Sequence, residues 1–132
     1  MASLDTNILV RYLIQDDAKQ LALAKRLIRK SVAAGQTLFV PVTVFLELEW
    51  VLRSSFRYTK EATLKTLDVL LAADELSFES ESAIEHARIL YAEGSADFSD
   101  CVHIALAYQA GEPPLWTFDV AASKVKGASL LA

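Results

Sequence analysis

Apolar residues follow two different spacings along this chain of 132 residues. Short apolar runs bounded by Pro, Gly or acidic residues are typical of strands, and several occur in order. We predict strands in the segment that ends at Leu4–Asp5, at residues 37–40, 76–78 and 115–118, and, as an edge strand, at 129–131. Between them, apolar residues recur three and four positions apart, which indicates amphipathic helices. This alternation predicts an α/β layered fold with a mainly parallel sheet.

Polar residues that can accept a backbone N–H hydrogen bond stand at the start of each predicted helix. These residues are Thr6 or Asn7, Asp16 or Asp17, Thr43, Thr59, Ser80 and Asp97. Gly35 and Gly94 are the expected stop signals. Because no internal repeat or linker interrupts the pattern, we predict a single domain over residues 1–132.

The composition is that of a globular protein, with 53% hydrophobic and 23% charged residues. Charged residues or Ser interrupt each apolar run before it reaches the roughly 18–20 residues of a membrane span, and no secretory signal is evident. Cys101 is the single cysteine, so an intrachain disulfide is excluded and a reducing cytoplasm is expected. We interpret Cys101 as a small buried thiol.

Charge is unevenly distributed, although the net charge is only -4. Residues 1–66 contain ten Lys or Arg and six Asp or Glu, whereas residues 67–132 contain three and eleven. The basic half could bind a polyanion while an acidic pocket holds a metal ion. Alternatively, the basic residues only solvate one helix face. The residues concerned are Lys25, Arg26, Arg29 and Lys30.

Four acidic residues stand where such a fold would bring them together. Asp5 and Asp119 follow predicted strands, and Glu47 and Asp100 lie near the starts of predicted helices. Open parallel sheets keep their ligand crevice at the carboxyl ends of the strands, so we expect these acids to converge there. Carboxylates without Cys or His ligands suit Mg²⁺ or Mn²⁺, and such an ion offsets the repulsion between crowded carboxylates. A bound ion of this kind promotes hydrolysis of phosphodiesters.

Helical spacing separates the roles of Glu47 and Glu49. Glu49 has Arg53 four residues later, the favourable order for an ion pair, and we interpret this pair as solvated. Glu47 points about 200° away from Glu49 on the same helix and lies beside Trp50 and Val51. An acid beside apolar neighbours needs a partner from elsewhere, because buried charges are paired or bind metal.

Asp97 and Asp100 open the same predicted helix. Asp97 is better placed as the N-cap, and Asp100 is then the third helical residue, where the helix dipole stabilises an acid. His103 comes three residues later and could support a metal ligand, although we favour a packed or hydrogen-bonded histidine.

Four short motifs therefore occur in order: Asp5-Thr6-Asn7, the run 45–52 around Glu47, Asp97-Phe98-Ser99-Asp100, and Thr117-Phe118-Asp119. Together they resemble those of PIN-domain proteins and, within that superfamily, the VapC toxins of bacterial type II toxin–antitoxin pairs. The likeness covers essentially the whole chain. It implies a three-layer fold in which helices flank a central, mainly parallel sheet of four to five strands.

The resemblance also implies a function. PIN-domain toxins of this kind are cytoplasmic Mg²⁺- or Mn²⁺-dependent endoribonucleases, usually homodimers, and a VapB-type antitoxin inhibits them. The mapped catalytic and metal-binding acids are Asp5, Glu47, Asp100 and Asp119. By the same mapping, the supporting polar groups are Asn7 and Thr117, and the ancillary acid is Asp97.

Three functions stay open at this point. The first is an RNase toxin, the second a PIN-like nuclease that processes RNA or cuts DNA, and the third a non-enzymatic scaffold that binds a partner. The intact set of acids argues against the third. An aspartyl phosphatase is disfavoured because Thr6-Asn7, rather than a second acid two positions on, follows Asp5. A DNA-binding repressor is disfavoured because the chain is acidic and has no evident helix-turn-helix.

Overall fold

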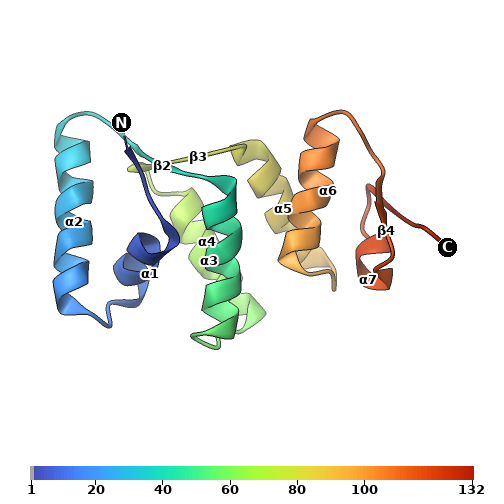
Figure 1. The fold of residues 1–132 in the computed structure, drawn as a ribbon, viewed down its shortest axis with the longest axis horizontal. Helices are drawn as coiled ribbons and strands as arrows, with labels where there is room; N and C mark the ends of the chain where they lie inside the picture. The colour runs from blue at the N-terminus through green and yellow to red at the C-terminus, as the bar shows by residue number, and fades with distance from the viewer. Residues whose placement is uncertain (1) are drawn as a thin grey trace. The chain divides into compact units, whose positions relative to one another are not determined.

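The computed structural model describes residues 2–132, so Met1, the first residue of the predicted domain, lies outside the described residues. The chain forms two compact units, one ending at Glu79 and the other spanning Ser80–Ala132. Figure 1 shows the course of the chain from blue at the N-terminus to red at the C-terminus. Each unit has its own parallel sheet and its own helices. The single domain over residues 1–132 stays a prediction.

A three-stranded parallel sheet forms the centre of the first unit, in the order β1-β2-β3. Its strands are β1 (Ala2–Ser3), β2 (Leu38–Val40) and β3 (Leu76–Phe78). Leu38 lies opposite Ala2 on one side and opposite Leu76 on the other. Leu38 and Val40 of the middle strand are buried. Phe39 lies on the opposite face and is half-buried, so both faces of β2 are covered at least in part, which explains its continuous apolar run.

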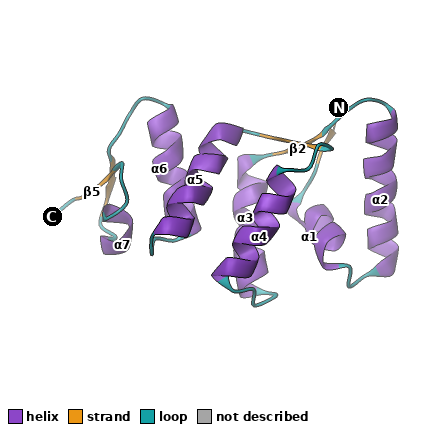
Figure 2. Cartoon of the chain, turned by 180° about the vertical axis from the view of Figure 1, so that it is seen from behind, coloured by secondary structure: helices purple, strands orange, loops and turns teal. Residues whose placement is uncertain are grey.

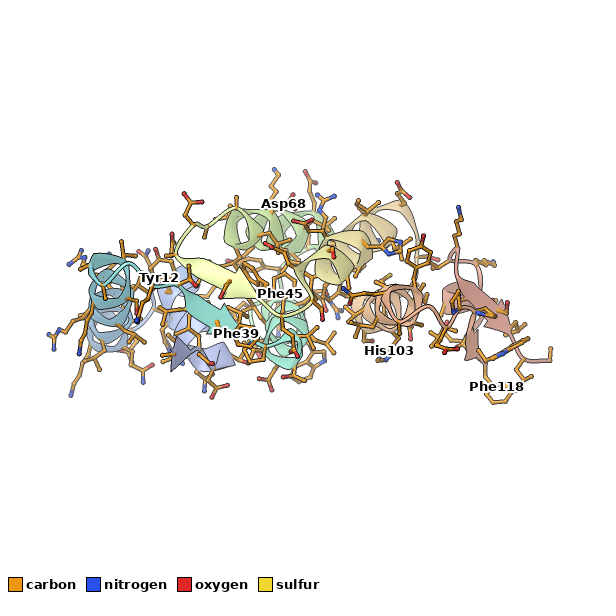
Figure 3. The ribbon with its side chains drawn as sticks, turned by 90° about the horizontal axis from the view of Figure 1, so that it is seen from above. Tyr12, Phe39, Phe45, Asp68, His103 and Phe118 are labelled. Carbon is orange, nitrogen blue, oxygen red and sulfur yellow. The ribbon has the colours of Figure 1, made fainter. Side chains whose placement is uncertain are left out.

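The helices of the first unit are α1 (Thr6–Ile14), α2 (Ala18–Ala33), α3 (Val42–Ser54) and α4 (Lys60–Leu71). α1 packs against α2 and α3, and α3 packs against α4. Phe45 of α3, labelled in Figure 3, meets Phe78 of β3 edge to face, with ring centres 5.7 Å apart. Leucines of α3 and α4 complete this core: Leu48, Leu52, Leu67 and Leu70.

The second unit begins with two helices packed side by side, α5 (Glu81–Glu93) and α6 (Phe98–Gln109), as Figure 2 shows. Two parallel strands follow, β4 (Leu115–Thr117) and β5 (Ala128–Leu130), joined through the short helix α7 (Val120–Ser123). The rings of Tyr91 on α5 and Phe98 on α6 have centres 5.2 Å apart. Ile104 and Ala105 of α6 are buried as well.

The predicted α/β class is confirmed, and the predicted strands appear in parallel sheets of three and two strands. Two predicted helix starts are confirmed by their hydrogen bonds. Asp17 accepts the Gln20 N–H at 3.0 Å, and Thr59 accepts the Ala62 N–H at 3.1 Å. Within residues 2–132, no helix has both the length and the apolar character needed to cross a bilayer.

Two other predicted helix starts were wrong. The first helix is capped not by Thr6 or Asn7 but by Asp5, whose backbone is still extended and whose carboxylate accepts the Thr6 N–H. The third helix begins directly after Pro41, two residues ahead of the position that a cap at Thr43 would give. Proline fixes its own φ near the value found at helix starts. The first N–H of the helix, from Val42, donates to Glu79 Oε1 at 2.8 Å.

Candidate metal-binding site

Asp5 lies at the junction of β1 and α1. The Leu4 N–H donates to the Phe39 carbonyl at 2.9 Å, which ties the end of β1 to β2. Asp5 then caps α1 by accepting the Thr6 N–H on Oδ1 at 2.7 Å. The residue is exposed, so Oδ2 and the remaining lone pair of Oδ1 can reach a ligand. A side chain that begins the helix thus also presents a carboxylate at the carboxyl end of a strand.

Glu47 is joined to the same place by Thr6. The Thr6 hydroxyl donates to Glu47 Oε1 and so links the start of α1 to α3. Thr6 is only 3% exposed, whereas Glu47 is exposed. The expected outside partner for Glu47 is therefore confirmed, but the expectation of a buried charge was wrong. Asp5 and Glu47 thus both accept hydrogen bonds from Thr6, a buried residue.

Glu49 is the buried acid of α3, with 1% of its surface exposed. Arg53 donates to both of its carboxylate oxygens, from Nε to Oε2 and from Nη2 to Oε1, the latter at 3.0 Å. The predicted ion pair is confirmed, but its solvated setting was wrong. α3 packs against α1 on one side and α4 on another, so its buried surface extends further around the helix than an apolar stripe indicates.

Asn7 is exposed near the start of α1, at a groove of about 340 Å³ between α1 and α2. Leu23 and Leu27 line the groove from α2, and Leu23 is 53% exposed. Arg11 lies along the same groove and is held by an ion pair with Asp16 at 2.8 Å. The groove is lined mainly by apolar side chains, together with Asn7, Arg11 and Gln20, and Asn7 comes two residues after Asp5.

In the second unit, Asp97 and Asp100 open α6. Asp97 is the N-cap residue, as predicted, and Asp100 lies in the first turn. Partial burial raises the pKa of the Asp100 carboxyl, the charges of Asp119 and Asp97 raise it further, and His103 opposes them. These three acids therefore lie close enough for their charges to repel one another, a strain that a bound cation relieves.

Asp119 follows β4 by one residue and caps α7, because its Oδ1 accepts the Ala122 N–H at 2.9 Å. Thr117 Oγ1 accepts the Asp119 N–H at 3.0 Å. This bond gives Thr117 a physical means of supporting the site, because its hydroxyl holds the backbone that carries the Asp119 carboxylate. Asp119 repeats the setting of Asp5, an exposed acid that follows a parallel strand and caps the next helix.

Two other residues singled out in the sequence have simple environments. Cys101 is fully buried, which confirms its interpretation as a structural thiol. His103 is exposed, so the packed histidine was wrong, whereas the alternative of a hydrogen-bonded histidine stays a prediction. Its imidazole still acts on Asp100, whose pKa it lowers.

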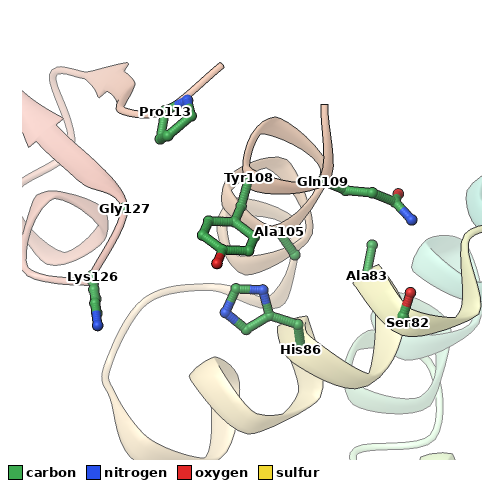
Figure 4. A pocket seen from close by; sticks show the side chains of 9 residues that line it. All are labelled: Ser82, Ala83, His86, Ala105, Tyr108, Gln109, Pro113, Lys126 and Gly127. Atoms are coloured by element: carbon green, nitrogen blue, oxygen red, sulfur yellow. The ribbon is translucent and has the colours of Figure 1, made fainter. Parts of the chain in front are cut away.

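The second unit also contains a groove of about 590 Å³ between α5, α6 and the segment before β5, shown in Figure 4. His86 meets Tyr108 edge on at its wall, with ring centres 5.5 Å apart. Lys126 lies at the opposite side of the opening in that view. Its lining includes no predicted site acid. The groove is therefore separate from the acids of α6 and α7.

The donor chemistry fits a hard divalent cation. The predicted ligands are all carboxylates, and Asp5, Glu47 and Asp119 are exposed. Within residues 2–132, neither unit holds a ready cage of three or more His, Cys, Asp or Glu side chains. Burial raises the pKa of Asp100, and the charges of Asp119 and Asp97 raise it further, so a cation at these carboxylates would offset their mutual repulsion.

Thr6 is the site residue that the sequence interpretation did not assign. Its signal was its place directly after Asp5, but its bond to Glu47 spans 41 positions in the chain. The spacing of residues within one helix or strand cannot predict a contact between residues so far apart in the chain.

Comparisons with known proteins give the family of the chain. The family model described as PIN domain matches residues 2–128 of the chain. A curated protein named VapC ribonuclease, from Aquifex aeolicus (strain VF5), is 25% identical over 111 residues. The matched segment covers 84% of this chain and 82% of that protein.

Proposed function

The chain belongs to the PIN domain family, and from this premise we propose that it is a Mg²⁺- or Mn²⁺-dependent endoribonuclease that acts as the toxin of a toxin–antitoxin pair. The likeness to a VapC ribonuclease over most of both chains supports RNA as the substrate. An exposed basic surface on α2 suits a polyanion as well. It consists of Arg26, Arg29 and Lys30.

One observation carries the proposal: both units present an exposed acid just after a parallel strand. Asp5 follows β1 and Asp119 follows β4, and each also caps the next helix. Glu47 is tied to the first acid through Thr6, and Asp100 responds to the charge of the second. This arrangement supports divalent-metal chemistry on a phosphodiester.

The acids that we assign to the ion are Asp5, Glu47, Asp100 and Asp119, with Asn7, Thr117 and Asp97 as supporting groups. When bound, the ion lowers the pKa of a water molecule and neutralises charge at the phosphodiester. The side chains of the protein contribute by holding the ligands in position. The Thr117 hydroxyl fixes the backbone of Asp119, and the helix-capping bonds restrict the rotamers of Asp5 and Asp119.

The groove between α1 and α2 is the proposed binding site for an apolar segment of a VapB-type antitoxin. Leu23 and Leu27 provide an apolar wall, and Asn7, which comes two residues after Asp5, also lines the groove. An antitoxin segment seated there could bring a basic side chain to the acids and so block metal and substrate. A toxin–antitoxin complex that keeps full nuclease activity would refute this arrangement.

The proposed function is tested by brief expression in a host that lacks the antitoxin, followed by sequencing of the new RNA 5′ ends. The protein should stop growth and produce recurrent RNA ends at defined sites. Asp100→Asn should abolish both effects, whereas Asp16→Asn, which loses only an exposed pair with Arg11, should keep them. DNA breaks without RNA ends would favour the DNA nuclease, and a bound partner without any cleavage would favour the scaffold.

A further inference from the structure

Thr6 contacts two proposed metal ligands with two different groups. Its backbone N–H donates to Asp5 Oδ1 at 2.7 Å, and its hydroxyl donates to Glu47 Oε1. Thr6 is 3% exposed, whereas both acids are exposed. The buried Thr6 is thus hydrogen-bonded to the exposed carboxylates of both Asp5 and Glu47.

The helix itself does not require this hydroxyl. A Thr at a helix start commonly caps it by accepting a backbone N–H, but Asp5 already caps α1. A Thr inside a helix commonly donates to the carbonyl four residues earlier, as Thr63 does to Thr59 at 2.9 Å. Four residues before Thr6 is Ala2, in β1, so that local acceptor is lacking. The hydroxyl donates instead to a side chain on another helix.

The bond has a defined effect on Glu47. An exposed glutamate samples several rotamers, and ordering it costs conformational entropy when it binds an ion. A hydroxyl has one hydrogen, and its donation to Oε1 selects one orientation of the carboxylate. Because Glu47 is exposed, Oε2 and the remaining lone pair of Oε1 stay available to a cation. Hydrogen bonds of this kind commonly set the affinity of a metal ligand.

We propose that Thr6 is a positioning residue for the metal-binding acids, which orders Glu47 through its hydroxyl and Asp5 through its backbone. This inference rests on the proposed function, because it assumes that the two acids hold a divalent ion. Thr6 itself contacts neither the ion nor the substrate in this assignment.

Two substitutions separate the hydroxyl from the rest of the side chain. Thr6→Val keeps the shape and removes the donor, whereas Thr6→Ser keeps the donor and removes a methyl group. The matched control is Thr63→Val, which removes a buried hydroxyl of the same unit that, within residues 2–132, donates to the backbone carbonyl of Thr59. Thr6→Ala is a second variant without the hydroxyl, in case valine does not fit.

The readout is Mn²⁺ affinity, measured by titration calorimetry without RNA, with melting curves in EDTA as the folding control. Thr6→Val and Thr6→Ala should weaken Mn²⁺ binding roughly tenfold or more, and Thr6→Ser should stay within about twofold of the wild type. Thr63→Val should lower the melting temperature and leave the affinity unchanged. In the Glu47→Gln background, Thr6→Val should cause no further loss, because its acceptor has already lost its charge.

Equal Mn²⁺ affinity of Thr6→Val and the wild type would overturn the inference, and so would a Thr6→Ser variant as weak as Thr6→Val. Either result leaves the proposed function intact if the wild type binds Mn²⁺ and cuts RNA. A wild type that neither binds Mn²⁺ nor cuts RNA overturns the proposed function, and this inference with it.

Discussion

Glu47 and Glu49 lie two residues apart on α3 and differ in their surroundings. Glu47 is exposed and accepts one hydrogen bond from Thr6. Glu49 is 1% exposed and accepts two from Arg53, whose side chain is 35% exposed. The first is therefore placed to bind a ligand and the second to hold the fold together.

Substitution by glutamine should separate activity from stability at these two positions. Glu47→Gln should abolish most RNA cleavage and weaken Mn²⁺ binding, while the fold survives because an exposed charge is lost. Glu49→Gln should keep most of the activity but lower the free energy of unfolding by about 2 kcal/mol, because Arg53 loses a buried ionic partner. The measurements are cleavage rate against metal concentration and melting curves in EDTA.

The reverse result has a clear meaning. A Glu49→Gln variant that is inactive yet as stable as the wild type, beside an active Glu47→Gln, would mean that the two acids on α3 were assigned to the wrong roles. Loss of both activity and fold in Glu47→Gln would instead make it a structural residue.

The sequence predicted that the two glutamates have different roles, but it did not predict which of them is buried. Helical geometry correctly put them on different faces and paired Glu49 with Arg53. Which face is buried depends on the helices that pack against α3, and those contacts come from segments far away in the chain. The role of Thr6 was not predicted for the same reason, because its acceptor, Glu47, lies 41 positions away in the chain.

At the scale of elements, two of the proposed ligands also begin helices. Asp5 caps α1 and Asp119 caps α7, each through a hydrogen bond to its own carboxylate. A cap needs only an oxygen acceptor, whereas a ligand for Mg²⁺ or Mn²⁺ needs the negative charge. Asparagine supplies the oxygen acceptor without the negative charge.

We predict that Asp5→Asn and Asp5→Ala are equally inactive but differ in stability. Asn is as good an N-cap as Asp, whereas Ala lowers the stability by about 1 kcal/mol. The control is Asp17→Ala, which removes the cap of α2 outside the proposed site and should lose similar stability with full cleavage. Melting curves and RNA cleavage assays measure the two properties.

An active Asp5→Asn variant would contradict the assignment of Asp5 as a ligand. Equal melting temperatures of Asp5→Asn and Asp5→Ala would contradict its capping role.

Strands and helix positions were predictable because their apolar spacing is local. Thr59 and Asp17 were recognisable as caps for the same reason. The start of α3 was not, since it begins after Pro41, which has no side-chain acceptor, and its first N–H, from Val42, donates to Glu79, 37 positions away in the chain. Asp5 was assigned to metal binding alone, although one carboxylate can do both.

At the scale of the whole molecule, the PIN domain match runs across both compact units. Exposed apolar side chains are present on the helices of the first unit. Trp50 of α3 is 59% exposed and Val69 of α4 is 65% exposed. A contiguous apolar surface commonly marks a contact with another chain, and we propose that these two side chains belong to the interface of the expected homodimer.

The wild-type protein should be a dimer by light scattering at tens of micromolar, and Trp50→Lys should shift it towards the monomer. Lys65→Gln is the control, because this exposed residue of α4 has only a surface pair with Glu61 to lose. A wild type that stays monomeric at high micromolar concentration would contradict the homodimer, and a dimeric Trp50→Lys would place its interface elsewhere.

The central claim is that the acids act by holding a divalent ion, and metal dependence of RNA cleavage by the purified protein tests it most directly. The protein should cut a defined RNA in Mg²⁺ or Mn²⁺, stop in EDTA and recover when the metal is restored, because carboxylates alone cannot stabilise the added charge of the transition state. Asp100→Asn, prepared in the same way, should show no cleavage and so excludes a contaminating nuclease. Full activity of the wild type in EDTA, with Asp100→Asn inactive, would contradict the account.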